Sequence, residues 1–80
     1  MPVVLRDRGF RLYFYANEGN PLEPPHVHAE RGDAEAKVWL QPEVKLAYND
    51  GFSAAALRDV LELVTVNRSR LEQAWHEFFG

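Results

Sequence analysis

The hydrophobic pattern of this chain changes its period once, near residues 49–51, and this change limits the folds that the chain can adopt. Before it, apolar and polar residues alternate, most clearly in the aromatic-rich run Phe10–Ala16, which is typical of strands with one covered face. After it, apolar residues recur at helical spacing: Leu57, Val60, Leu61, Val64, Leu71, Trp75 and Phe78. The pattern predicts an α+β fold, a two-layer sandwich with helices on one face of an antiparallel sheet.

Turn residues divide the first fifty residues into a β-meander of three to four strands. The predicted strands are Phe10–Ala16, His26–Glu30, Ala34–Leu40 and Val44–Tyr48. Val3–Leu5 is placed to pair with the first of them across the turn at Arg8-Gly9. The segment Asn17–Pro25 is rich in Asn, Gly and Pro and predicts a loop, whose final Pro24-Pro25 favours extended backbone.

The helical part of the sequence begins after Ser53, a suitable N-cap, and runs from Ala54 to Phe79. One unbroken helix over this range would be about 39 Å long, more than the roughly 30 Å diameter of a small domain. Two arrangements are therefore open. The helix breaks near Thr65–Ser69, where helix propensity is weakest, or its end overhangs the domain. The second arrangement would expose an aromatic partner-binding patch made of Trp75, Phe78 and Phe79.

Composition narrows the class of protein. Eighty residues without Cys allow one domain, residues 1–80, and exclude disulfide-stapled proteins, thiolate zinc sites and cysteine nucleophiles. A formal net charge of −3 differs from that of a strongly basic nucleic-acid binder. No signal peptide, membrane span or lipidation motif is recognisable, so a cytoplasmic protein without membrane association is expected. Phosphate-binding loops and nucleophile elbows are also missing, which argues against a nucleotide-hydrolysing enzyme.

Period-two alternation also predicts which side chains share the uncovered face of the sheet. The apolar sets should lie under the helices, including Val44, Leu46 and Tyr48 of the last strand. The remaining side chains should share the open face: Arg11, Tyr13, Tyr15, His26, His28, Glu30, Lys37, Trp39 and Lys45. Aromatic and basic residues interleaved in this way can stack and clamp single-stranded nucleic acid. Alternatively, Tyr and Trp are simply good strand residues whose rings cover neighbouring backbone. The acidic charge balance also argues against autonomous nucleic-acid binding.

The pair His26-x-His28 is the most informative local feature, and three interpretations of it stay open. As metal ligands, the two imidazoles and Glu30 could hold a divalent ion such as zinc. As acid–base groups, they could act without metal on an RNA 2′-hydroxyl and its phosphate. Arg11, Lys37 and Tyr13 would then assist at the same site. As structural groups, they could bind loop carbonyls and hold the Pro-rich segment in place.

The signature Pro24-Pro25-His26-Val27-His28 resembles a family of small prokaryotic proteins, the domain of unknown function number forty-one-sixty. The resemblance runs nearly end to end, from Met1-Pro2 to Trp75, and includes Arg70-Leu71-Glu72. It implies a small cognate protein partner, in the style of toxin–antitoxin gene pairs, and functional roles for His26 and His28. The sequence departs from the family at Glu18-Gly19, where many members carry Asp-His, and at Asn67, where His is common.

Two functions of different classes are therefore expected. The first is a cytoplasmic toxin–antitoxin-like module component that works with a small cognate protein and has RNA as a candidate substrate. The second is a non-catalytic protein-binding or regulatory module whose His pair is structural. A divalent metal-binding protein is the third option. No cofactor is expected for the first two, and zinc is the candidate metal for the third.

Overall fold

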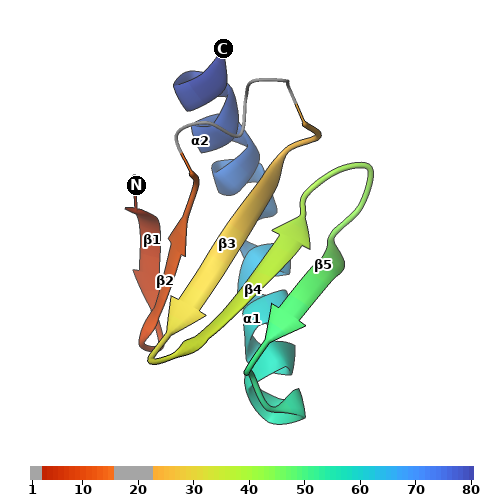
Figure 1. Ribbon diagram of the computed structural model, residues 1–80. Helices are drawn as coiled ribbons and strands as arrows, with labels where there is room; N and C mark the ends of the chain where they lie inside the picture. Colours follow the sequence, from red (N-terminus) through yellow and green to blue (C-terminus); the bar gives the residue numbers. More distant parts are fainter. Residues whose placement is uncertain (1–2, 16–22) are drawn as a thin grey trace.

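The computed structural model describes residues 3–15 and 23–80 and forms two layers, a five-stranded antiparallel sheet and two helices (Figure 1). The elements in chain order are β1 (Val3–Asp7), β2 (Phe10–Tyr13), β3 (His26–Arg31), β4 (Ala34–Trp39), β5 (Lys45–Asp50), α1 (Ala54–Val66) and α2 (Arg68–Phe79). Strand order in the sheet is β1-β2-β3-β4-β5, so each strand pairs with its neighbour in sequence. The predicted α+β sandwich is confirmed, with β1 as the additional strand.

Some sequence predictions fall on residues outside the described ones. Residues 16–22 are not described. They include Ala16, most of the predicted loop Asn17–Pro25, and Glu18-Gly19, where the sequence departs from the family pattern. Within the described residues, β2 ends at Tyr13, three residues earlier than the predicted strand.

The core lies between the helices and one face of the sheet. Alternate residues of the three inner strands are buried there, as predicted: Phe10, Leu12, Val27, Ala29, Ala36 and Val38. Facing side chains come from both helices: Ala56, Val60, Leu63, Val64, Leu71 and Trp75. In so small a domain the burial of these side chains is the main stabilising contribution. The opposite face of the sheet carries no helix (Figure 1).

A β-bulge corrects the prediction that Tyr48 lies under the helices. Lys37 pairs with Tyr48 and Val38 pairs with Leu46, so the register shifts between these two pairs. Ala47 is the extra residue, and an extra residue reverses the alternation on one side of a bulge. Leu46 therefore stays on the core side, whereas Tyr48 turns to the open face, where its side chain is 42% exposed.

The helical segment breaks at Asn67, so the first of the two predicted arrangements is correct. Ser53 caps α1 through its Oγ, which accepts from the backbone N–H of Ala56 at 3.2 Å. Asn67 leaves the helical conformation (φ −103°, ψ 15°), and its Nδ2 donates to the Leu63 carbonyl at 2.9 Å. The chain then turns into α2, so the overhanging helix is wrong.

Because α2 packs back onto the sheet, Trp75 is a core residue, 2% exposed. The overhanging helix would have exposed it. Its ring contacts that of Phe14 edge-on, with 5.3 Å between the ring centroids. Of the expected aromatic patch, Phe79 is partly buried and Phe78 remains 45% exposed. Within residues 3–15 and 23–80 no helix has the length and apolar character that a membrane crossing requires.

The contrast between Leu63 and Val66 on α1 gives a direct test of this packing. Leu63 is 2% exposed and Val66 is 76% exposed. The variant Leu63→Ala should lower the free energy of unfolding by about 2–5 kcal/mol through the cavity that it leaves, whereas Val66→Ala should change it by less than about 0.5 kcal/mol. Urea unfolding followed by circular dichroism measures both, and equal losses would contradict this arrangement of α1.

Candidate functional site

Strand pairing aligns four side chains in one row on the face of the sheet that carries no helix. The prediction that this row is open to solvent is wrong for Tyr13 and His28, each only 2% exposed, and His26 beside them is fully buried. Tyr13 pairs with His28, His28 with Lys37, and Lys37 with Tyr48. Directly paired residues of antiparallel strands project to the same side. The structure therefore brings together three of the predicted catalytic candidates, Tyr13, His28 and Lys37, and adds Tyr48 through the bulge.

Glu35 is the residue of this site that sequence reasoning missed. Its Oε2 accepts from the hydroxyl of Tyr13 at 2.9 Å and from that of Tyr15 at 3.2 Å. The same oxygen lies 3.3 Å from Nδ1 of His28. Alternation in Ala34–Leu40 puts Glu35 on the same face as Lys37, but Glu35 was not among the residues predicted to share that face. In a sequence, a Glu beside a turn is typical of an ordinary solvent-exposed residue. Only its contacts with Tyr13, Tyr15 and His28 in the structure identify Glu35 as part of the site.

The imidazole of His28 has a fixed orientation. Its ring stacks on Tyr13, with 5.4 Å between centroids and 19° between planes, and meets Tyr15 edge-on at 4.5 Å. The hydroxyl of Tyr48 lies 3.5 Å from the same Nδ1 that faces Glu35. A carboxylate can only accept hydrogen bonds, so Glu35 favours the tautomer with its proton on Nδ1.

His26 lies beside His28, with 5.4 Å between the two ring centroids. Its Nδ1 is 3.0 Å from the Pro24 carbonyl oxygen, and since a carbonyl only accepts, Nδ1 is the donor. The ring also contacts Trp39 and Trp75, with centroids 5.3 Å and 4.9 Å away. His26 thus makes the contact with the Pro-rich segment that the structural interpretation predicts.

The two predicted basic residues of the site are both paired with carboxylates. Arg11 forms an ion pair with Glu30, its partner in the strand register. Nζ of Lys37 lies 3.1 Å from Glu23 and 4.5 Å from the centroid of the Trp39 ring. In the described part of the chain no three His, Asp or Glu side chains are grouped so that they could hold a metal ion.

Burial raises the pKa of the Tyr13 phenol above its usual value of 10.0, and its hydrogen bonds with Tyr15 and Glu35 act in the same direction. Deprotonation would place a second negative charge beside the Glu35 carboxylate. Tyr13 is therefore a permanent hydrogen-bond donor that holds Glu35 in place, and it is not suited to act as a base.

This raised pKa predicts a loss of stability at alkaline pH. In the unfolded chain a tyrosine releases its proton near pH 10, whereas the folded chain keeps it. The contribution of Tyr13 is thus fully present below about pH 10 and is lost as the pH rises further. The variant Tyr13→Phe should be less stable at pH 7, by about 1.5–3 kcal/mol for the lost hydrogen bond to a charged group. It should also lose less stability between pH 9 and 11 than the wild type. Urea midpoints of both proteins across this range test it, and equal alkaline losses would contradict it.

Comparison with family models gives one match, to the domain of unknown function DUF4160, over residues 9–76. No curated protein and no solved structure matches the chain. The matched range covers most of the chain. It includes strands β2 to β5 and both histidines of the site. The resemblance expected from the Pro-Pro-His-x-His signature is thereby confirmed, and the chain belongs to the DUF4160 family.

Proposed function

We propose that this protein is a cytoplasmic component of a bacterial toxin–antitoxin-like module, works with a small protein partner and cleaves RNA without a metal ion. The observation that supports the reaction is the carboxylate–imidazole pair Glu35–His28 with a second imidazole, His26, beside it. A carboxylate behind an imidazole fixes its tautomer and its orientation, which is the arrangement that general acid–base catalysis uses.

The proposed reaction is an internal transesterification. The imidazole of His28 takes the proton of a ribose 2′-hydroxyl as its oxygen attacks the adjacent phosphorus. The bond from phosphorus to the 5′-oxygen of the next nucleotide breaks, and His26 donates a proton to that leaving oxygen. The products are a 2′,3′-cyclic phosphate and a 5′-hydroxyl, so no oxidant, reductant or second substrate is needed. Lys37 is the partner of His28 on the neighbouring strand. Its Nζ would break the ion pair with Glu23 and contact the phosphate instead.

A second function is favoured by a separate observation, the burial of the histidines. His26 is 0% exposed and His28 is 2% exposed, and the cations Arg11 and Lys37 are both neutralised by carboxylates. In a non-catalytic binding module the His pair would hold Pro24-Pro25 against the sheet. The partner would then contact the aromatic end of α2, where Phe78 is the exposed ring.

Induced expression in a bacterial host separates the two functions. Wild type and Arg58→Ala, which alters an exposed residue of α1, should arrest growth and yield RNA fragments that end in 2′,3′-cyclic phosphate. His28→Ala should lower the cleavage rate by about 10²–10⁴-fold, the range for loss of a general acid or base. Glu35→Gln should lower it less, because the imidazole remains.

Purified protein in buffer with EDTA provides the matching control, since metal-free cleavage should survive chelation. Each variant is first shown to be folded by thermal unfolding. Equal cleavage by wild type and His28→Ala would refute the catalytic assignment. A folded wild type that neither arrests growth nor cleaves RNA would favour the binding module, and activity restored only by added zinc would favour the metal site.

A further inference from the structure

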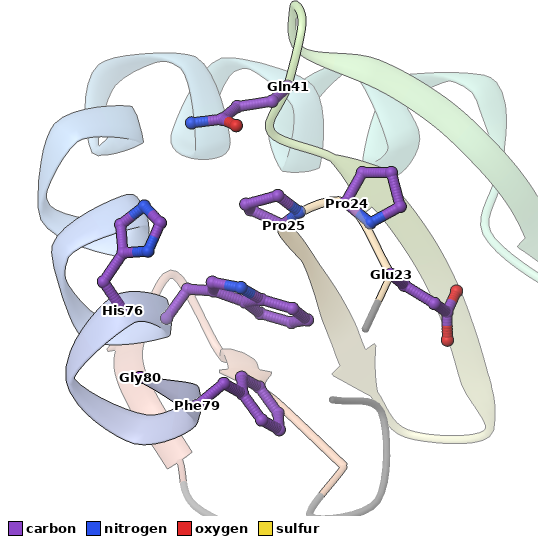
Figure 2. Close-up of a pocket in the computed structure, with 8 residues that line it drawn as sticks. Glu23, Pro24, Pro25, Gln41, His76, Phe79 and Gly80 are labelled. Carbon is purple, nitrogen blue, oxygen red and sulfur yellow. The ribbon is translucent and has the colours of Figure 1, made fainter. Parts of the chain in front are cut away.

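A pocket of about 410 Å³ lies between the last turns of α2 and the segment that leads into β3 (Figure 2). It is lined by Glu23, Pro24, Pro25, Gln41, Trp75, His76, Phe79 and Gly80. The walls are mainly two proline rings and two aromatic side chains. Figure 2 shows Gln41 and His76 bordering one end and Phe79 the other, whereas the carboxylate of Glu23 is directed away on the far side of Pro24.

The pocket adjoins the proposed catalytic site through two of its own walls. The Pro24 carbonyl accepts the hydrogen bond from His26, and the Trp75 ring centroid lies 4.9 Å from that of His26. A group bound in the pocket would therefore lie next to the residues that orient this imidazole.

The chemistry of the walls favours a neutral, flat ring with polar edges. Among the described residues that line the pocket there is no Lys or Arg, so these walls offer a phosphate no strong cation. An aliphatic side chain would cover the Gln41 amide and the His76 imidazole without bonding to them, which costs free energy. A nucleobase would lie against proline and aromatic surfaces and present donors and acceptors to those two groups.

The amide of Gln41 is held ready for such a contact. Its Nε2 donates to Glu72 at 2.8 Å, and the other carboxylate oxygen of Glu72 accepts from Arg68 at 2.7 Å. The hydrogen bond from Gln41, together with Arg68, lowers the pKa of Glu72, so this acceptor is ionised at neutral pH. Gln41 keeps one N–H and its carbonyl oxygen, a donor–acceptor pair that matches N7 and the 6-amino group of adenine.

We propose that this pocket binds an adenine base of the RNA substrate, next to the bond that is cleaved, through Phe79 and Gln41. The assignment rests on the proposed function for its substrate class. Glu72 acts as a positioning residue, because it touches Gln41 and not the base.

Titration with free adenosine, followed by NMR of the folded protein, tests the pocket without any cleavage. Adenosine should shift the Trp75 indole N–H resonance, and uridine should bind more weakly. Phe79→Ala should weaken adenosine binding by about fivefold or more, the range for loss of one base–aromatic stack. Val66→Ala is the control, since Val66 is 76% exposed on α1 and does not line the pocket. Its affinity should equal that of wild type.

Gln41→Ala is the second variant, chosen because Gln41 is only partly buried and its loss should leave the fold intact. It should reduce the preference for adenosine over uridine by about fivefold or more. No shift with millimolar adenosine, or an equal effect of Val66→Ala, would refute the adenine site. A larger response to N-acetyl-leucinamide than to adenosine would refute it too and assign the pocket to a protein side chain. Adenosine binding in a protein that cleaves no RNA would refute the proposed reaction and support the adenine pocket. RNA cleavage by a protein that does not bind adenosine would support the reaction and refute the adenine pocket.

Discussion

The register of β3 is the constraint on which the rest of this structure depends. The strand pairs on both sides, with β2 and with β4. Val27 and Ala29 are fully buried under the helices, and a slip of one residue would exchange them with the two histidines. Burial of this small apolar pair therefore decides which face carries His26 and His28. The site is determined by packing on the opposite side of the sheet.

Much of the fold and part of the site could be predicted from sequence because strand alternation and helical spacing are local patterns. The inner strands show this best, since Val27 and Ala29 of β3 lie in the core under the helices, as expected. The position of Tyr48 could not be predicted, because a bulge at Ala47 depends on how β4 and β5 fit together. Glu35 lies on the face that alternation gives it, but its role depends on Tyr13 of β2, on Tyr15 just after β2 and on His28 of β3.

The break between the helices shows a different limit of sequence reasoning. Weak helix propensity near Asn67 indicated where a break was favourable, and the side-chain bond from Asn67 to Leu63 fits that expectation. Whether the chain turned there depended on the gain from burying Leu71 and Trp75 against the sheet. That gain is a property of the assembled core, and in this chain it brings the most aromatic part of α2 back onto the domain.

Trp75 belongs to the core and also lines the pocket together with Pro25. Binding in the pocket is therefore thermodynamically linked to folding. A domain of this size has little stability to spare. Any molecule that occupies the pocket only when Trp75 is in place draws the whole chain toward its folded state, by an amount that grows with the concentration of the molecule. The population of folded protein in a cell would then depend on supply of that molecule as well as on the sequence.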